Sequence, residues 1–232
     1  MNARTILAGA VFACLVDGAL AVSPAHRERL QTFGDEFVDI TPGRGKFPAS
    51  FTMGRDDGSE AERPAHRVSF DSPFAVARYE VPQNLWQAVM GANPSRWKGD
   101  RNSVEMLSRA GNQSCYSFGD DVSQLDDHAW SLQNASGNDP PVGAKKPNAW
   151  GLYDVHGYLW EWCADTWHDD YGGAPDDGSP RADGDEKRRV LRGGSWKDPA
   201  EQLTSSFRKP GEHTLKDDAV GLRCILATEP KR

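Results

Sequence analysis

Alternating apolar and polar positions in the first half of the chain predict short β-strands. Apolar side chains fall at every second position in residues 37–40, 51–53 and 67–70, the period of a strand with one buried face. Residues 74–81 form a further strand-like run. Residues 56–58, with the sequence DDG, supply turn-forming side chains between two of these runs. The pattern therefore predicts small strands joined by tight turns.

Helical periodicity occurs in two places. Residues 27–31 predict a short helix inside a leader segment at 22–46. Residues 82–90 predict a second helix, with Pro82 in its first turn and one apolar face made by Leu85, Trp86, Val89 and Met90. We interpret Trp86 as a core residue.

The second half of the chain has a different amino-acid composition. From residue 112 onward it is rich in Gly, Asp, Asn and Pro, and long regular elements are expected to be scarce. This composition favours a loop-rich α+β domain with short strands, which we place at residues 47–228, after the leader.

The N-terminus has the pattern of an export signal. Arg4 is followed by a mostly apolar run at 5–16, and residues 19–21 read ALA, a signal-peptidase site. Residues 1–21 are therefore expected to be a signal peptide and the chain to be periplasmic or secreted. The alternative is a short membrane anchor, but the apolar run is shorter than the roughly 20 residues that a spanning helix needs. No membrane span is expected after cleavage.

Charge and cysteine content narrow the classes further. The formal net charge of -7 argues against nucleic acid as a partner, because nucleic-acid binding depends on clustered Lys and Arg. Cys115, Cys163 and Cys224 remain after signal cleavage. In an oxidising compartment two of them could pair, or all three could be thiols that pack as small hydrophobic side chains.

Three motifs in the second half carry the densest chemical signal. Residues 151–163 read GLYDVHGYLWEWC, residues 192–196 read RGGSW and residues 221–224 read GLRC. Glycines at fixed places mark sharp turns or close backbone approach. Tryptophans on both sides of Glu161 indicate a carboxylate in an apolar frame, where it must be paired, bound to a cation or protonated.

Together these motifs resemble the family of the formylglycine-generating enzyme, also called the sulfatase-modifying factor family. Further blocks match that family in the same order, at 51–54 (FTMG), 62–68 (ERPAHRV), 79–81 (YEV), 86–95 (WQAVMGANPS), 141–143 (PVG) and 146–148 (KPN). The resemblance implies a C-type-lectin-like α+β fold. It also implies that the middle of the domain is shortened, because the family carries two helices at the place where this sequence has only residues 104–111.

The resemblance does not extend to the family's copper chemistry. The two copper-binding cysteines of the family map onto Asp198 and Leu203. Leucine cannot ligate a metal, and a carboxylate is a hard ligand unsuited to Cu(I). No copper is expected, and formylglycine-generating activity is not expected either.

A calcium site and a disulfide are also implied by the resemblance. The family's calcium site maps onto Glu161 with the backbone carbonyls of Tyr158, Leu159 and Cys163. Tyr158 stands where the family has asparagine, so one oxygen ligand is lost and a weaker site is expected. The alternative is that Glu161 accepts hydrogen bonds from nearby backbone. Because the family often tethers the region around Cys115 to its last strand, the resemblance favours a disulfide between Cys115 and Cys224.

Other candidate sites have simpler interpretations. The acidic stretch at 165–186 lacks the spacing of an EF-hand and is expected to be a solvated loop. His156 and His168 have no third ligand, so zinc is not supported, and Ser195 lacks the GxSxG context of a hydrolase. We interpret three arginines as structural partners of buried carboxylates: Arg192, Arg208 and Arg223.

Three functional hypotheses follow. The first is an exported family member with a groove that binds a peptide, a glycan or a small molecule, formed by Trp160, Trp162, Ser195, Trp196 and Asp198. The second is a periplasmic maturation enzyme that depends on a metal or on oxygen, such as one that matures a siderophore chromophore. The third is a truncated paralogue without function. Oxygen or redox-metal dependence of an activity would separate the second from the first.

Overall fold

The computed structural model describes residues 23–90, 103–104, 114–137 and 140–227. The expected signal peptide at 1–21 and most of the shortened segment at 104–111 lie outside these residues. Within the described part of the chain, no helix is both long and apolar enough to span a membrane.

The strands predicted in the first half are present, within one or two residues of their expected ends. They are β1 (Phe37–Ile40), β2 (Ser50–Met53), β3 (His66–Ser69), β4 (Phe74–Ala77) and β5 (Val81–Pro82). The run at 74–81 is divided because the chain bends at Arg78, whose carbonyl accepts hydrogen bonds from the Tyr153 N–H at 3.0 Å and from Arg223 Nη1 at 2.9 Å. Backbone partners elsewhere in the molecule therefore end β4 early.

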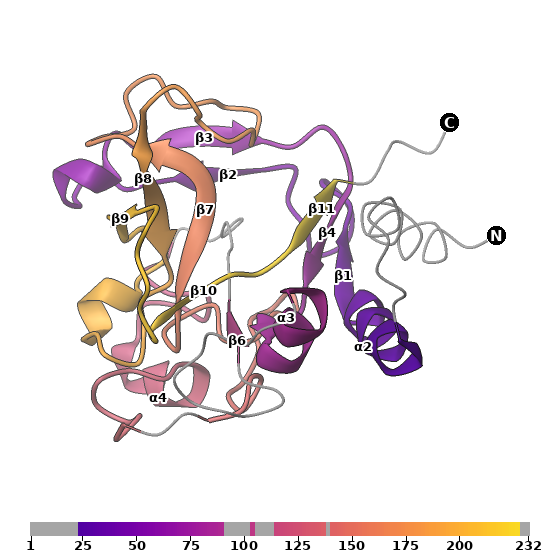
Figure 1. Ribbon diagram of the computed structural model, residues 1–232. Helices are drawn as coiled ribbons and strands as arrows, with labels where there is room; N and C mark the ends of the chain where they lie inside the picture. The colour runs from indigo at the N-terminus through magenta and orange to yellow at the C-terminus, as the bar shows by residue number, and fades with distance from the viewer. Residues whose placement is uncertain (1–22, 91–102, 105–113, 138–139, 228–232) are drawn as a thin grey trace.

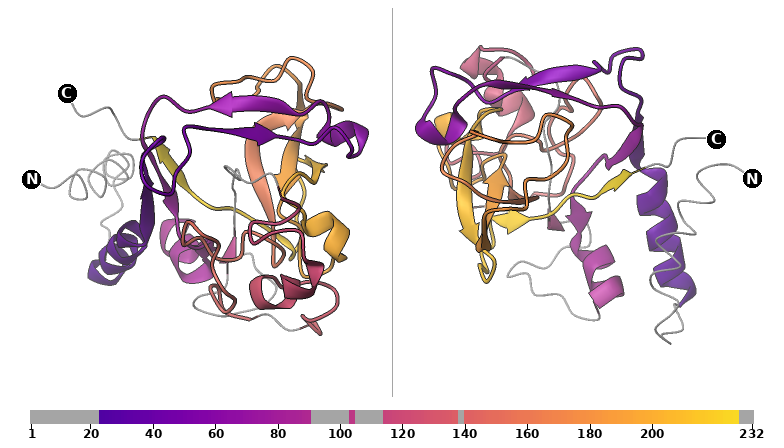
Figure 2. Two further views of the ribbon diagram at one scale, coloured as in Figure 1. Left: turned by 180° about the vertical axis from the view of Figure 1, so that it is seen from behind. Right: turned by 90° about the horizontal axis from the view of Figure 1, so that it is seen from above.

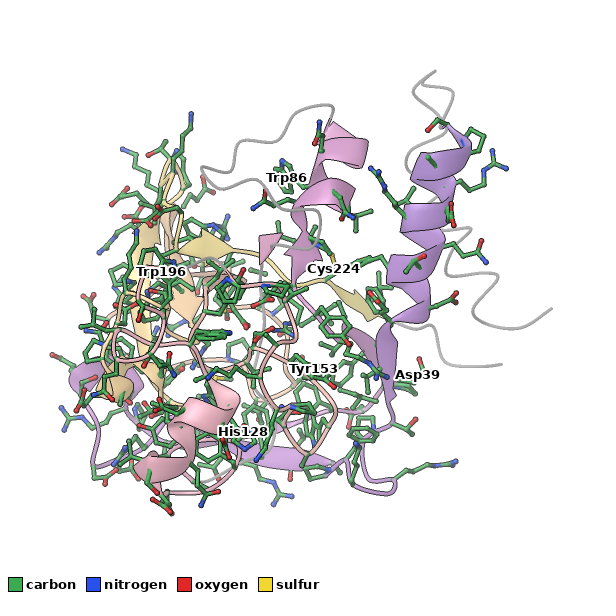
Figure 3. The ribbon with its side chains drawn as sticks, turned by 90° about the horizontal axis from the view of Figure 1, so that it is seen from below. Asp39, Trp86, His128, Tyr153, Trp196 and Cys224 are labelled. Atoms are coloured by element: carbon green, nitrogen blue, oxygen red, sulfur yellow. The ribbon has the colours of Figure 1, made fainter. Side chains whose placement is uncertain are left out.

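Two helices pack at one end of the first sheet. α2 (Pro24–Asp35) is longer than the predicted helix at 27–31, and α3 (Gln83–Met90) matches the second prediction. Figure 1 shows both beside β1 and β4. Pro82 is the last residue of β5 and precedes α3, so it is not in the first turn. Trp86, labelled in Figure 3, is only partly buried, which corrects its interpretation as a core residue.

The first sheet joins the two ends of the chain. Its order is β1-β4-β11, where β11 (Ile225–Ala227) and β1 both pair antiparallel with β4. β1 lies in the expected leader, so from residue 37 the leader shares this sheet with the C-terminal strand. The β2–β3 pair crosses above both sheets in Figures 1 and 2.

The second sheet holds the motifs. Its order is β10-β7-β8-β9, formed by β10 (Val220–Gly221), β7 (Trp160–Trp167), β8 (Asp185–Arg192) and β9 (Arg208–Glu212). β7 and β8 have eight residues each, so long elements are not as scarce here as the composition indicated. β8 begins with the charged residues DEKRR, and β7 is buried along most of its length, so neither shows simple alternation.

The remaining elements are short. They are β6 (Ser103–Val104), α4 (Leu125–His128), and the 3₁₀ turns η1 (Glu60–Glu62), η2 (Val122–Gln124) and η3 (Ala200–Leu203). The core is divided among several small clusters, two of which centre on Ile40 with Val76 and on Tyr116 with Leu203. The structure is thus the expected loop-rich α+β fold with short strands.

Candidate functional site

Asp198 lies at the centre of a hydrogen-bonded cluster. The indole N–H of Trp160 donates to Asp198 Oδ2 at 2.7 Å, and the Ser195 hydroxyl donates to the same oxygen. The N–H of Asp198 donates to the Ser195 carbonyl at 3.0 Å, which closes the turn after the RGGS motif. Trp160 is 2% exposed and Ser195 1% exposed. We call Trp160, Ser195, Asp198 and Lys209 the Asp198 cluster.

Lys209 is the member of this cluster that sequence reasoning missed. Its Nζ lies 3.8 Å from the centre of the Trp160 ring. Burial lowers the pKa of its ammonium group, and the nearby Asp198 carboxylate opposes that shift. No motif marks Lys209, because it reaches Trp160 only through the pairing of β9 with β8, where it stands opposite Leu191.

The predicted groove residues are only partly brought together. Trp160, Ser195 and Asp198 are in direct contact, as described above. Trp196, labelled in Figure 3 beside the second sheet, packs against a cluster with Tyr158 and Leu159, and Lys197 Nζ lies 5.1 Å from its ring centre. Trp162 packs over Gly211 of β9 instead, where an added Cβ would come within 2.8 Å of its ring.

The second copper position of the family is part of the hydrophobic core. Leu203 is 0% exposed and packs with Tyr116, Leu125, Ala129 and Ala200. Its side chain lies so close to Gly157 and Gly194 that a Cβ on either glycine would approach it within 3 Å. Together with the engaged carboxylate of Asp198, this leaves no pair of soft ligands at the two positions.

Glu161 is paired with an arginine. The carboxylate is 1% exposed, and its Oε1 lies 3.4 Å from Nη2 of Arg223, which is itself fully buried. Arg223 also donates to the carbonyls of Arg78 and Tyr153 at 2.9 and 2.7 Å. The structural role predicted for Arg223 is therefore confirmed.

The residues around Glu161 do not fit a calcium ion. Calcium prefers six to eight oxygen ligands. The Glu161 carboxylate is already paired with Arg223, and the carbonyl of Tyr158 accepts the Trp196 N–H at 3.0 Å. Within the described residues, no three or more His, Cys, Asp and Glu side chains are grouped to hold a metal ion.

His156 is held as a structural residue. It is 1% exposed; its Nδ1 lies 2.8 Å from the Leu203 carbonyl, and its Nε2 accepts the Ser117 N–H at 2.8 Å. These two contacts fit a neutral ring protonated at Nδ1. His168 lies elsewhere and pairs with the exposed Asp183 at 3.1 Å. Each ring therefore has its own protein partners.

The expected disulfide between Cys115 and Cys224 is not formed. Cys115, Cys163 and Cys224 are free thiols. Cys115 packs beside Tyr116, with its sulfur 3.9 Å from Arg55 Nη1, whereas the Cys224 carbonyl pairs with Ala77 next to the first sheet. Figure 3 shows Cys224 on the segment that leads to β11. The two cysteines thus belong to different packing units, and the alternative of three thiols describes the structure.

The acidic stretch at 165–186 is a loop in its middle part only: residues 168–184 form a largely exposed loop, as predicted, whereas residues 165–167 belong to β7 and residues 185–186 to β8. Its carboxylates bond mainly to their own neighbourhood: Asp177 accepts the Ser179 N–H at 2.9 Å, and Asp183 pairs with Arg181 at 3.2 Å. Such contacts are typical of turn-forming Asp residues.

Comparison with known proteins places this geometry in a family. Residues 100–228 match the sulfatase-modifying factor enzyme 1-like domain. The chain is 35% identical over 231 residues to the serine/threonine-protein kinase pkn1 of Chlamydia pneumoniae, and 32% identical over 119 residues to the formylglycine-generating enzyme of Thermomonospora curvata. These matches cover 90% and 43% of the chain, but it spans only 35% and 39% of the two relatives.

A solved structure supports the same fold. The structure of PvdO from Pseudomonas aeruginosa superposes with a TM-score of 0.71 at 28% identity, and the match covers 83% of this chain and 94% of that one. The arrangement of short strands and long loops is therefore that of the formylglycine-generating-enzyme fold.

Proposed function

Because the chain belongs to the sulfatase-modifying factor enzyme 1-like family, we propose that it is an exported member that binds a ligand at the Asp198 cluster and does not generate formylglycine. Two observations support the proposal: the family match over residues 100–228, and the replacement of both copper-binding cysteines. The export signal at residues 1–21 supports the periplasm or the exterior as its location.

The proposed absence of formylglycine-generating activity is carried by one observation, the place of Leu203. A copper oxidase of this type needs two thiolates that hold Cu(I) together. Leu203 is 0% exposed and fills the core under Gly157 and Gly194, so its position faces packed side chains. The other position, Asp198, has one carboxylate oxygen engaged by Trp160 and Ser195. These two positions therefore support the proposal that the chain does not carry out the copper chemistry of the family's oxidase.

What remains at this place suits binding. Asp198 and Lys209 are partly exposed around the buried Trp160, and Trp196 is partly exposed in the neighbouring cluster with Tyr158 and Leu159. Beside them, Lys197 Nζ pairs with Asp217 at 2.8 Å and with Asp218. A partly exposed ring such as that of Trp196, next to charged side chains, can hold a peptide or a sugar ring by stacking and hydrogen bonds. The ligand we propose is therefore a peptide, a glycan or a small molecule with both polar and apolar parts.

A second candidate function rests on the similarity to PvdO, at 28% identity and a TM-score of 0.71. It is the maturation enzyme that depends on a metal or on oxygen. In that case Asp198 and Lys209 would serve as the acid and base of the site, because each has a partner that fixes it beside the other.

Ligand titration tests the first candidate. Short peptides and oligosaccharides are titrated into the purified chain, and tryptophan fluorescence is read because Trp160 belongs to the Asp198 cluster. Lys209→Gln should weaken binding about tenfold, since it removes the charge over Trp160. Lys187→Gln, an exposed lysine of β8 outside the cluster, is the matched control and should bind like the parent.

Two outcomes would overturn this proposal. Equal affinity of the Lys209→Gln and Lys187→Gln variants would show that the ligand does not bind at the Asp198 cluster. Absence of binding across the panel, together with oxygen uptake on addition of a metal, would favour the maturation enzyme.

A further inference from the structure

A cavity lies on the other face of the second sheet from the Asp198 cluster. Successive side chains of a strand point to opposite faces, so Trp160 and Trp162 face one way and Glu161 and Cys163 the other. The cavity is lined from that second face by Cys163, Val190, Arg192 and Arg208, and from neighbouring loops by Tyr171 and Arg181. It is thus separate from the proposed ligand site.

Arg208 brings an unpaired charge to this cavity. The residue is 5% exposed, and its guanidinium lies between two aromatic rings, 4.6 Å from the Trp167 centre and 4.2 Å from the Tyr171 centre. Nε donates to the Ala61 carbonyl, but Nη2 is buried without a hydrogen-bond partner. None of the ion pairs within the described residues includes Arg208. Its interpretation as a partner of a buried carboxylate is therefore wrong.

The pKa of Arg208 agrees with this geometry. Burial, followed by the charge of nearby Arg192, lowers it to about 10, against the smaller opposing effects of Asp165 and Asp170. A buried cation that lacks a paired anion is costly, so a donor of this kind is expected to have a partner in the working protein.

Two further arginines reach the same cavity. Arg181 Nε pairs with Asp183 at 3.2 Å, while its Nη1 is buried without a partner. Arg192 is 8% exposed; it stands opposite Arg208 in the β8–β9 register and donates to the Ser206 carbonyl at 3.4 Å and to the Tyr171 hydroxyl. Arg192 has no carboxylate partner within the described residues either, which corrects its predicted role. Arg181 and Arg208, which carry the orphaned donors Nη1 and Nη2, therefore both line one cavity.

The acidic residues at the cavity do not neutralise these arginines. Asp165 and Asp170 also line it. Asp165 Oδ1 accepts the Arg181 backbone N–H at 3.0 Å, and Asp170 Oδ1 accepts the Gly172 N–H at 2.7 Å. Neither carboxylate lies within ion-pair distance of the three guanidinium groups in the described part of the chain. Three arginines against two aspartates leave the lining net positive even with His168 neutral.

The size of the cavity limits the ligand. Its volume is about 60 Å³, counted as space for the centres of water-sized molecules. One water needs about 10–15 Å³ in this measure, so the cavity has room for roughly four to six waters, about the size of one tetrahedral oxyanion. A drug-sized ligand needs several times more space.

We infer that this cavity binds a phosphate or sulfate group, held by the guanidinium groups of Arg181 and Arg208. Guanidinium donors suit oxyanions because their N–H groups are planar and fixed in direction. The rings of Trp167 and Tyr171 hold Arg208 in place before the ligand arrives. The group enters either as a free ion or on a monoester.

Thermal unfolding of the full chain tests this inference. Unfolding is followed in HEPES with added sodium phosphate, sodium sulfate, sodium acetate or sodium chloride, at matched ionic strength. Phosphate or sulfate should raise Tm by about 5 °C at saturation relative to chloride, because a ligand that binds only the folded state stabilises it. Phosphoserine is the monoester arm. A larger rise with phosphoserine assigns an esterified group, and a rise with inorganic phosphate alone assigns the free ion; both support the site.

Variants locate the binding. Arg181→Gln and Arg208→Gln should each abolish the rise, whereas Arg188→Gln, a partly exposed arginine of β8 outside the cavity, should keep it in full. If Arg208→Gln fails to fold, Arg181→Gln alone decides between the outcomes, because its side chain is 17% exposed and its loss is better tolerated. A full rise in Arg181→Gln, a rise with chloride equal to that with phosphate, or a greater rise with acetate would overturn the inference.

Discussion

Asp154 is a buried residue whose carboxyl group is harder to ionise in the folded protein than in the unfolded chain. It is 2% exposed, with Oδ2 accepting the Gly143 N–H at 2.6 Å and Oδ1 buried without a hydrogen-bond partner. Burial raises the pKa of its carboxyl group to about 6; the Gly143 N–H and Arg223 oppose this shift, while Glu161 adds to it. The folded state therefore holds a proton that the unfolded state releases near its ordinary value of 3.8.

Asp154→Asn tests this residue. Because the folded pKa lies above the unfolded one, the Asp154 contribution to stability is greatest below pH 4 and is lost as the pH rises through about 6. The amide carries no charge, so the variant should be more stable than the parent by about 2–3 kcal/mol at pH 7.5 and equal to it near pH 4. Urea unfolding between pH 4 and 8 measures this, with exposed Asp71→Asn as control. Parallel profiles for Asp154→Asn and the parent would contradict it.

The sequence allowed some site residues to be predicted and others not, depending on whether their contacts are local or distant along the chain. Trp160, Glu161 and Ser195 lie in local motifs of glycine and aromatic residues, where each neighbour restricts the next. Lys209 was missed, and Arg208 was predicted only as a partner of a buried carboxylate. Both lie in the plain sequence FRKPG, and their partners are more than 30 residues away along the chain. Their roles come from the β8–β9 register, which no local pattern encodes.

The turn that leads into β7 depends on two consecutive residues with left-handed backbone conformations. Gly157 has φ +71° and the following Tyr158 has φ +64°, both in the left-handed region. Gly157 donates to the Gly193 carbonyl at 2.8 Å and Tyr158 to the Trp130 carbonyl at 2.9 Å. A Cβ on Gly157 would lie 2.0 Å from the Trp130 oxygen, so this glycine is required by a close backbone approach.

Gly157→Ala should therefore destabilise the protein strongly. The left-handed backbone costs alanine about 1–2 kcal/mol, and the contact with Trp130 must also be relieved by moving backbone, so we expect a total above about 3 kcal/mol. Gly151→Ala is the control, because Gly151 has φ +83° and no atom within 4 Å of the added Cβ. It should cost only about 1–2 kcal/mol. Chemical unfolding compares the two; equal losses would show that the close approach does not matter.

Elements were predictable where one face of a strand or helix meets the core and the other meets solvent. β1, β2 and β3 alternate and were placed within one or two residues, and α3 shows a clear apolar face. β8 was not predicted, because its first five residues are charged and its position depends on two neighbouring strands. α2 extends past its predicted bounds on both sides, where its sequence has no marked apolar face.

At the scale of the whole molecule, strands from both ends of the chain pair in one sheet, so the two sheets belong to one folded unit. The family match covers residues 100–228, yet β11 within it pairs with β4 outside it, and β4 in turn pairs with β1. Arg223 fixes this junction by reaching the carbonyls of Ala77, Arg78 and Tyr153 as well as Glu161. The first half of the chain is thus part of the same folded unit.

This folded unit keeps the family's glycine, aromatic and arginine motifs, whereas the two positions that bind copper in the family have other roles here. Glu161, Ser195 and Arg223 are all buried and bonded, so the frame motifs are accounted for by packing alone. Asp198 and Leu203 have become a hydrogen-bond acceptor and a core residue. The fold could be anticipated from the ordered motifs, whereas the proposed absence of formylglycine-generating activity rests on two single positions.

The most direct test is the conversion of a cysteine-containing peptide in the presence of Cu(I) and oxygen, followed by mass spectrometry of the peptide. We expect no formylglycine above the level produced by copper alone, because Asp198 and Leu203 cannot hold Cu(I). Heat-denatured chain is the control for free copper chemistry. Copper-dependent formation of formylglycine that Asp198→Ala abolishes would contradict the account.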